Sequence, residues 1–300
     1  DRQITLLHGT DLPGFDYSVT KNTTLKACQT ACEGDRLCRA FTFNQKTKWC
    51  FLKGGVGPAT AFAGATSGTI SAVPSREDLA TTRSQELPFP AQDLLESAKS
   101  FANGLATSNP PPAGAAYGNL VAEGDAAAAN ANAPGAVTSY RQALAILAND
   151  PALWLKLAAV ELTEADAAAA KQQETDATNF GNDAAIAALN AFLLSETTAE
   201  RAAGLASLAR GLERAQQWPY SIATYRASIA LVADADLEAR LDKEVAEHGF
   251  RVLSSNVDSE AATPRICAVF SDTLPDGKTD ISSYVVVDDA PQGAIETEQT

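Results

Sequence analysis

The stretch from residue 25 to residue 53 decides the fold at the start of the chain, and it reads LKACQTACEGDRLCRAFTFNQKTKWCFLK. It contains Cys28, Cys32, Cys38 and Cys50, which are four of the five cysteines in 300 residues. Four cysteines so close together form either a disulfide framework or a metal site. The gaps between them are three, five and eleven residues, with no Cys-x-x-Cys spacing and no nearby His, so the pattern favours two disulfides over zinc. Disulfides imply an oxidising compartment, such as the periplasm, the cell surface or the medium.

A helix is predicted at the start of this stretch. Thr23 or Thr24 is a suitable N-cap for a helix over residues 25–32. Cys28 and Cys32 then lie at positions i and i+4, on one face of the helix. Parallel side chains on one face point outward together, which disfavours a bond between these two cysteines. Both must therefore bond to cysteines beyond the helix.

Two disulfide pairings remain open for the four cysteines. The nested pairing joins Cys32 to Cys38 and Cys28 to Cys50, whereas the other joins Cys28 to Cys38 and Cys32 to Cys50. We favour the nested pairing, because Cys32 is nearest to the short loop that leads to Cys38.

Strands are predicted on both sides of the helix. Residues 39–44 and 49–53 form a hairpin about the polar turn 45–48. A further strand is expected at residues 3–8, and a closing strand at residues 68–73. The first 73 residues thus have the elements of a small α+β domain.

These residues resemble the PAN/apple family. The resemblance rests on the order of four strings: DLPGFD at 11–16, C-x3-C at 28–32, CRAFTF at 38–43 and CFLK at 50–53. It implies a PAN domain over residues 1–73, in which two disulfides staple a helix to a curved antiparallel sheet, in agreement with the nested pairing. The additional outer cysteine pair of the apple form is missing, so the short PAN form is implied. PAN domains bind proteins or carbohydrates and are not enzymes.

A linker and an alanine-rich helical region are predicted next. Residues 74–91 are polar, interrupted by prolines and without a period, which is typical of a linker. Residues 92–255 have the pattern of helices rich in Ala and Leu. Two helix starts carry clear signals: an N-cap followed by proline at Asp150-Pro151, and a capping box from Thr197 to Glu200.

The helical region contains an internal repeat. Residues 134–147 align with residues 219–232 at an offset of 85. Small and aromatic residues recur in a pattern similar to that of tetratricopeptide repeats: Ala136, Ala143 and Ala158, with Tyr140 and Trp154. We therefore expect an all-α, TPR-like array. A role as spacer or scaffold is favoured over peptide binding.

The last part of the chain is predicted to be β. Residues 263–270 and 284–288 have the pattern of strands, with a turn at 274–277 between them. Two or three strands do not form a stable domain. Residues 262–300 are therefore expected to be part of a β-sandwich.

A second resemblance lies in the same residues. The string PRICAVFS at 264–271, with YVVV at 284–287 and an acidic tail, is similar to the opening of the first macroglobulin domain in bacterial alpha-2-macroglobulins. One branch of that family also places a PAN domain and helices before it. The resemblance implies the amino-terminal region of a larger protease inhibitor of the bacterial envelope. It also implies that Cys267 is unpaired in this segment, because its partner would lie on a strand beyond Thr300.

The chain is expected to be a mature or truncated product, because it begins with Asp1 and contains no Met. In alpha-2-macroglobulins a bait region and, in many members, a thioester within a Cys-x-Glu-Gln motif trap the protease. The 300 residues contain no such motif, so both would lie outside this segment.

Charge divides the chain in the same way as the cysteines. The formal net charge is −14, which argues against general nucleic-acid binding. Residues 1–73 carry eight Lys and Arg against five Asp and Glu, a net charge of +3, and the remainder carries fifteen against thirty-two, or −17. The basic charge either attracts an acidic partner, such as an anionic glycan or the envelope surface, or is simply solvated, and the sequence favours the second.

No catalytic, cofactor or metal site is indicated. His8 and His248 have no Ser or Cys motif beside them, and the glycines of 54–57 are not followed by the Lys and helix of a phosphate loop. No apolar run is long enough to span a membrane. The leading hypothesis is thus the recognition and spacer region of a periplasmic or cell-surface macroglobulin-like inhibitor, with proteases as partners of the full-length protein. The alternative is a free-standing binding or adhesion scaffold for proteins or glycans.

Overall fold

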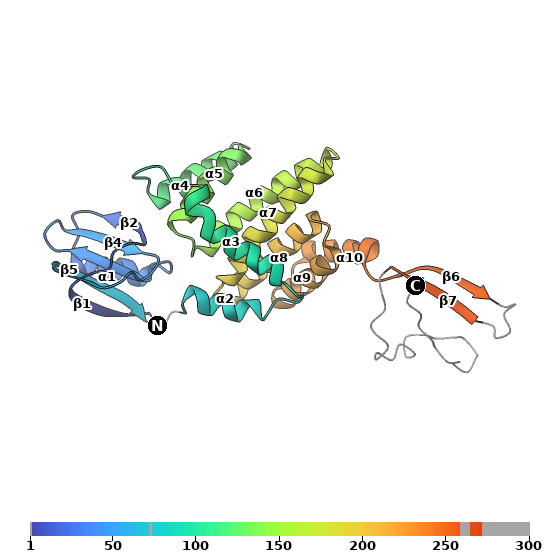
Figure 1. Cartoon of the computed structure of the whole chain (residues 1–300), viewed down its shortest axis with the longest axis horizontal. Helices are drawn as coiled ribbons and strands as arrows, with labels where there is room; N and C mark the ends of the chain where they lie inside the picture. Colours follow the sequence, from blue (N-terminus) through green and yellow to red (C-terminus); the bar gives the residue numbers. More distant parts are fainter. Residues whose placement is uncertain (1, 72–73, 259–264, 272–300) are drawn as a thin grey trace. The chain divides into compact units, whose positions relative to one another are not determined.

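The computed structural model describes residues 2–71, 74–258 and 265–271. The chain divides into two compact units, Asp1–Leu241 and Asp242–Thr300. The first unit contains a small β-sheet domain and most of a helical array, and the described part of the second contains a two-stranded hairpin (Figure 1).

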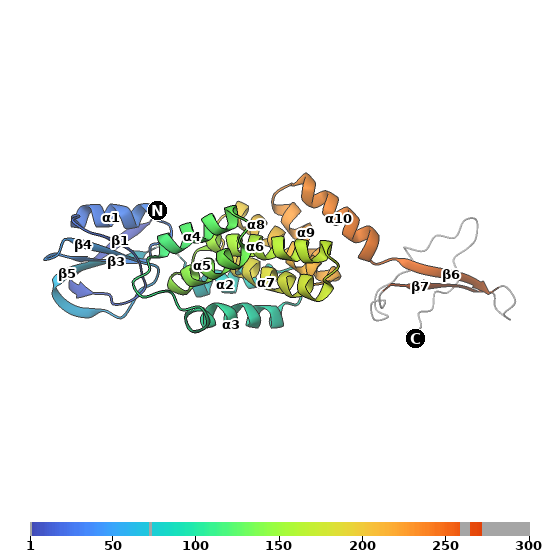
Figure 2. The same cartoon turned by 90° about the horizontal axis from the view of Figure 1, so that it is seen from above.

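The amino-terminal domain is a five-stranded antiparallel sheet with one helix. Its elements are β1 (Gln3–Asp11), β2 (Asp16–Thr20), α1 (Leu25–Gly34), β3 (Ala40–Asn44), β4 (Trp49–Lys53) and β5 (Thr60–Ser71). The strand order is β1-β5-β3-β4-β2, and α1 lies on one face of the sheet (Figure 2). The core between helix and sheet holds the four clustered cysteines with Phe41 and Phe43.

Local signals explain where α1 begins and where the strands depart from the predicted ones. The side chain of Thr24 accepts a hydrogen bond from the backbone N–H of Ala27, which makes Thr24 the N-cap. The strand predicted at 68–73 begins earlier, at Thr60, because its outer residues pair with β1 although they lack a period-two hydrophobic pattern. The pairing shifts register near Gly9, whose positive φ of 66° suits glycine.

The prediction of a linker over residues 74–91 is wrong for its first half. Helix α2 (Arg76–Ser84) forms there, because Ser75 and Asp78 make a complete capping box. Leu79 on this helix is buried, and α2 packs against α7. The segment is therefore part of the helical array.

The array continues with α3 (Gln92–Ser108), α4 (Tyr117–Ala129), α5 (Ala133–Ile146), α6 (Pro151–Ala170), α7 (Glu174–Leu193), α8 (Thr198–Arg214), α9 (Trp218–Leu231) and α10 (Ala235–His248). Helices α4 and α5, α6 and α7, and α8 and α9 pack as antiparallel hairpins, and α3 packs across α5 and α7 (Figure 2). The predicted N-caps at Asp150 and Thr197 are confirmed.

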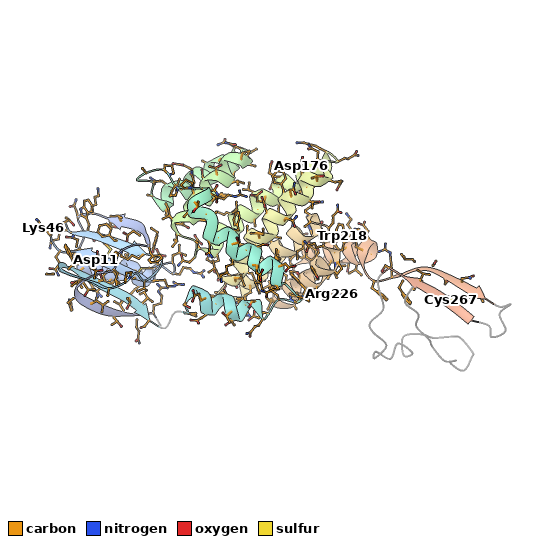
Figure 3. All side chains as sticks on the ribbon, in the orientation of Figure 1. Asp11, Lys46, Asp176, Trp218, Arg226 and Cys267 are labelled. Atoms are coloured by element: carbon orange, nitrogen blue, oxygen red, sulfur yellow. A yellow bond between two sulfur atoms is a disulfide. The ribbon has the colours of Figure 1, made fainter. Side chains whose placement is uncertain are left out.

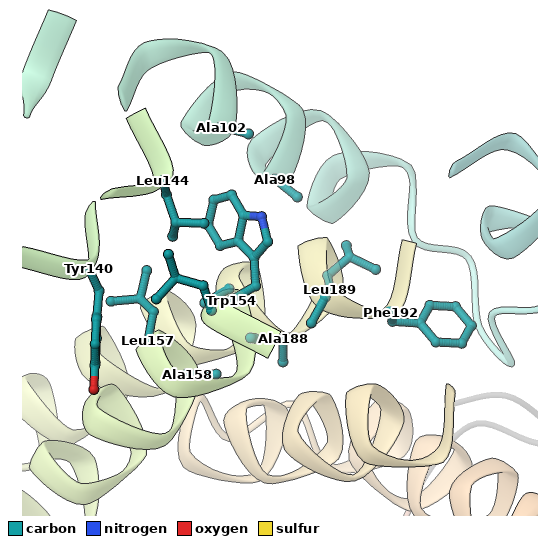
Figure 4. Packing of buried hydrophobic residues seen from close by; sticks show 14 of the residues in the cluster. Ala98, Ala102, Tyr140, Leu144, Trp154, Leu157, Ala158, Ala188, Leu189 and Phe192 are labelled. Atoms are coloured by element: carbon teal, nitrogen blue, oxygen red, sulfur yellow. The ribbon is translucent and has the colours of Figure 1, made fainter. Parts of the chain in front are cut away.

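Trp154 lies at the centre of the helical core (Figure 4). Its side chain is fully buried, and its indole N–H donates a hydrogen bond to the carbonyl of Ala148 at 2.9 Å. Leu144 of α5, Ala98 of α3 and Leu189 of α7 belong to the same cluster. One aromatic side chain thus ties four helices together.

The internal repeat corresponds to equivalent helices. The aligned residues 134–147 and 219–232 form α5 and α9, each the second helix of a hairpin and each with a proline in its first turn. Tyr140 and Tyr225 are buried at the same place in the two helices. Each donates its hydroxyl to a carboxylate of the preceding helix, Tyr140 to Asp125 and Tyr225 to Glu213.

The described part of the second unit contains strands β6 (Val252–Asp258) and β7 (Arg265–Phe270), paired antiparallel. Residues 252–255, assigned to the helical region from the sequence, belong instead to β6, because their backbone pairs with β7. The strand predicted at 284–288 lies outside the described residues. The described residues thus show one hairpin and no macroglobulin sandwich.

Candidate binding site: the lysine-bearing end of the amino-terminal domain

Two disulfides fix the helix of the amino-terminal domain to its sheet. Cys28 bonds to Cys50 with a Cα–Cα distance of 5.6 Å, and Cys32 bonds to Cys38 with a distance of 5.3 Å. The first bond joins the first half of α1 to β4. The second bond closes the short loop between α1 and β3. In the described part of the chain Cys267 is free and exposed.

The turn between β3 and β4 is held in a defined conformation. The side-chain oxygen of Asn44 accepts hydrogen bonds from the backbone N–H groups of Lys46 and Thr47, both at 3.0 Å. The N–H of Lys48 donates to the carbonyl of Asn44 at 2.9 Å. Lys48 has a φ of 59°, a left-handed conformation that non-glycine residues adopt at a cost in energy.

The loop between β2 and α1 is bonded directly to this turn. The backbone N–H of Thr23 donates to the carbonyl of Lys48 at 2.9 Å. Asn22, beside it, also has a positive φ, of 53°. Two segments more than twenty residues apart in sequence therefore form one continuous surface at this end of the sheet.

A shallow, open depression of about 490 Å³ lies where these two segments meet. Its lining residues are Asn22, Thr23, Thr24, Leu25, Phe43 and Lys48. Hydroxyl, amide and ammonium groups thus surround one aromatic ring and one aliphatic side chain. Phe43 is 4% exposed and forms the floor, since it belongs to the core beneath the helix.

Four exposed lysines lie on or directly beside these two segments: Lys21, Lys46 and Lys48, and Lys26 in the first turn of α1. Among the described residues none of them lies within ion-pair distance of a carboxylate. The ammonium of Lys21 lies 4.5 Å from the ring centroid of Trp49, and that of Lys48 lies 6.0 Å from that of Phe43. Lys46 stands at the tip of the turn (Figure 3). We call this surface the lysine-bearing end.

The other basic side chains of the domain have partners. Lys53 is buried and forms an ion pair with Asp16. Arg2 donates to backbone carbonyls, including those of Cys32 and Cys38. The exposed basic side chains of the described domain that have no carboxylate partner are thus the four lysines.

The opposite end of β4 contacts the helical array. Leu147, which follows α5, is 3% exposed and packs into the core of the amino-terminal domain. The amide of Asn149 donates to the carbonyl of Gly54, directly after β4, at 2.7 Å. The rings of Tyr17 and Tyr117 meet edge to face at 6.2 Å. No sequence pattern distinguishes Leu147 or Tyr117 from ordinary helix-core residues, so this interface was not predicted.

Ion pairs reinforce the interface. Arg36 pairs with Glu200, and Arg39 pairs with Glu196 at 3.3 Å. Burial alone would raise the pKa of Glu200. The hydrogen bond from Arg36 and those from the backbone N–H groups of Glu196 and Thr197 outweigh burial and lower that pKa to about 2. The carboxylate of Glu200 therefore stays ionised at the interface.

An ion cluster in the array has one buried member, Glu161. Glu161 on α6 is 2% exposed and accepts a hydrogen bond at 2.9 Å from Arg141 on α5, which also lies 3.3 Å from Asp183 on α7. Burial raises the pKa of Glu161 to about 7, against the lowering effect of Arg141. These contacts join three helices.

The remaining residues singled out from the sequence lie apart from the lysine-bearing end. His8 lies in β1, and His248 lies at the end of α10. The segment 54–57 follows β4 as an irregular stretch. Within the described ranges no group of three or more His, Cys, Asp or Glu side chains is placed to hold a metal ion.

Comparison with known proteins agrees with the amino-terminal geometry. The PAN domain family matches residues 3–70, which contain the sheet, α1 and both disulfides. No curated protein matches the chain. The described residues therefore contain a disulfide-bonded PAN domain, typically a protein- or carbohydrate-binding module, followed by a helical array.

The disulfides and the PAN domain fit an extracellular or secreted protein. None of the helices in the described ranges is long and apolar enough to cross a membrane.

Proposed function

We propose that this chain is a recognition segment, in which the PAN domain binds a protein or glycan partner and the helical array holds the domain in place. In this proposal the chain is not an enzyme. One observation carries it. The two ends of β4 differ, because the end at Gly54 is packed against the array and the end at Trp49 continues into the exposed lysine-bearing end.

The contacts between the PAN domain and the array support the proposal that the array holds the PAN domain in place for its partner. Leu147, Asn149 and Tyr117 contact the PAN domain from the array, and two ion pairs add to these contacts. A binding domain held in this way loses less freedom when its partner binds, which favours affinity. The hairpins α4/α5, α6/α7 and α8/α9 are proposed to be TPR-like repeats that serve as a spacer.

The test is a binding screen with the disulfide-intact chain, immobilised through a carboxyl-terminal tag, against glycans and proteins of the bacterial envelope. We expect a partner that binds the immobilised chain. Excess free parent chain should displace this partner, whereas excess free Lys46→Glu/Lys48→Glu chain should not. If the double substitution leaves binding unchanged, the binding site does not lie at the lysine-bearing end. Hydrolytic activity of the purified chain would contradict the non-enzymatic assignment.

We propose, as the finer assignment, that the segment belongs to an envelope or periplasmic protein similar to bacterial alpha-2-macroglobulins. The support is the order of a PAN domain, helices and a β-hairpin that contains most of the string 264–271. Proteases would then be partners of the full-length protein, through a bait region outside these residues. Reading the gene beyond Thr300 tests this assignment. Successive β-sandwich domains and a bait segment are expected, and a stop codon there would rule it out.

A further inference from the structure

The lysine-bearing end has a chemistry that narrows the class of its ligand. This inference rests on the proposed binding function and goes further, to the charge and type of the partner. Lys21, Lys26, Lys46 and Lys48 carry four positive charges on or directly beside two short segments. No carboxylate within the described ranges neutralises them at ion-pair distance. Such a surface attracts a polyanion.

The surface is preorganised. The hydrogen bond from Thr23 to Lys48 joins the two segments, and the Cys28–Cys50 disulfide holds the helix and strand behind them. Asn44 fixes the turn through two backbone hydrogen bonds. A ligand that binds here does not have to order these loops, so less of the interaction energy is lost.

The lining of the depression resembles a sugar site in its chemistry. The side chains of Asn22, Thr23 and Thr24 offer hydroxyl and amide groups, which suit the hydroxyls of a pyranose ring. The half-buried Leu25 supplies a small apolar area for the C–H face of such a ring, and Phe43, 4% exposed, forms the floor beneath it. Carboxylate or sulfate groups on neighbouring sugars would then lie among the lysines.

Other polyanions fit less well. A single-stranded nucleic acid binds through exposed aromatic rings on which its bases stack, but the ammonium of Lys21 covers a face of Trp49 at 4.5 Å, and Phe43 is nearly buried. A membrane surface favours large apolar side chains that insert beside the lysines. The depression offers only the half-buried Leu25 for that purpose, and the exposed Val19, two residues before Lys21, adds one aliphatic side chain.

The negative charge of the rest of the chain favours approach of a polyanion to the PAN domain. Residues 74–300 carry a net charge of −17, whereas residues 1–73 carry +3. A polyanion is repelled from the body and attracted to the four lysines, so it meets the PAN domain first. We propose that the lysine-bearing end binds an acidic polysaccharide, a chain of sugars that carry carboxylate or sulfate groups.

The experiment measures binding of the full chain to polygalacturonate, dextran sulfate and neutral dextran by biolayer interferometry at several salt concentrations. We expect at least one acidic polymer to bind and neutral dextran not to bind. Affinity should fall as salt rises, because binding releases counterions. The double variant Lys46→Gln/Lys48→Gln should weaken binding by at least about fivefold, as expected for two lost surface charge contacts.

The matched control is Lys99→Gln/Lys171→Gln, which removes two exposed lysines from the helical array and changes the net charge equally. It should leave the affinity within about twofold, because neither lysine lies on the proposed site. Equal weakening by both double variants would show diffuse attraction and overturn the inference. Circular dichroism melts of both variants verify that they are folded.

The failure of this inference can be separated from that of the proposed function. Lysine-independent binding of a neutral glycan or a protein would overturn the acidic-polysaccharide assignment and leave the binding function intact. Tighter, lysine-dependent binding to phosphatidylglycerol vesicles than to either polymer would assign the site to a lipid surface and would also overturn it. Absence of any ligand from all of these classes would count against both.

Discussion

Replacing Gly211 with Ala tests the close packing of α7 and α8. A Cβ atom at this position would lie 2.6 Å from the backbone nitrogen of Ala185, 2.8 Å from its Cα and 3.0 Å from its Cβ. Ordinary contacts of this kind are about 3.4 to 4 Å, so the helices would have to separate by roughly 1 Å. The obstacle is mostly backbone, which no side-chain rotation relieves.

Two effects of opposite sign determine the magnitude. Ala is favoured over Gly inside a helix by up to about 1 kcal/mol. Overpacking of a dense core costs about 1 to 3 kcal/mol, and Leu208 and Leu212 beside Gly211 are fully buried, so the separation is felt by the whole cluster. We expect a net loss of about 1 to 2 kcal/mol in the free energy of unfolding.

Gly104 provides the matched control. It lies within α3, has a helical environment, and a Cβ atom there would meet nothing within 4 Å. Gly104→Ala should therefore raise stability by about 0.5 to 1 kcal/mol, from helix propensity alone. The difference between the two variants, about 1.5 to 3 kcal/mol, corresponds to roughly 3 to 12 °C in the midpoint of thermal unfolding for a unit of this size.

The assay is thermal unfolding followed by circular dichroism at the helical band, without reductant, together with urea unfolding at 25 °C. Gly211→Ala should unfold at a lower temperature than the parent and Gly104→Ala at a higher one. A Gly211→Ala midpoint equal to or above that of Gly104→Ala would refute the assignment of close backbone contact between α7 and α8.

Three further outcomes are expected. Lys48→Gly should raise the thermal midpoint, because glycine tolerates the φ of 59° at a gain of about 0.5 to 1 kcal/mol, and it should weaken binding of an acidic polymer, because it removes the charge of Lys48. A lower midpoint would contradict the left-handed turn. The pKa of Glu161 is raised to about 7 on folding, so its contribution to the free energy of unfolding is fully present below about pH 4.5 and is lost as pH rises through 7. Urea unfolding at pH 5 and pH 8 should show this loss in the parent and not in Glu161→Gln. The pKa of Glu200 is lowered to about 2, so its contribution to the free energy of unfolding is present above about pH 4.5 and is lost as pH falls toward 2. Unfolding of the parent and of Glu200→Gln over this pH range measures the contribution, because Glu200→Gln should lack this acid-dependent loss.

The sequence predicts the PAN domain well because its signals are local. Thr24 caps α1, a polar turn joins β3 to β4, and the cysteines within 23 residues limit the possible folds. Strand β5 was placed too short, since Thr60 and the residues after it owe their conformation to partners in β1 rather than to their own hydrophobic pattern.

The sequence predicts that this region is helical, but it does not predict helix α2 or the contacts with the PAN domain. Helix α2 was missed because its apolar content is low and its capping box uses Asp78, not the Glu or Gln that marks the usual motif. The interface at Leu147 could not be predicted, because burial against a distant domain leaves the same residue type as burial against a neighbouring helix. The lysine-bearing end had a partial signal in its charge, but only the bond from Thr23 to Lys48 shows that its two segments meet.

The position of β4 determines how the molecule would respond to a mechanical load. One end of this strand continues to the lysine-bearing end, and the other leads to Gly54, where Asn149 holds the domain to the array. Antiparallel strands flank β4 on both sides, β3 and β2, and their hydrogen bonds run across the strand. A ligand that pulls on Lys46 or Lys48 therefore loads the covalent backbone of β4, whereas one that pulls on Lys21, directly after β2, loads the hydrogen bonds between β2 and β4 together in shear. Attachment of the protein to a surface under flow would apply such a load. The Cys28–Cys50 disulfide then limits how far α1 and β4 can separate.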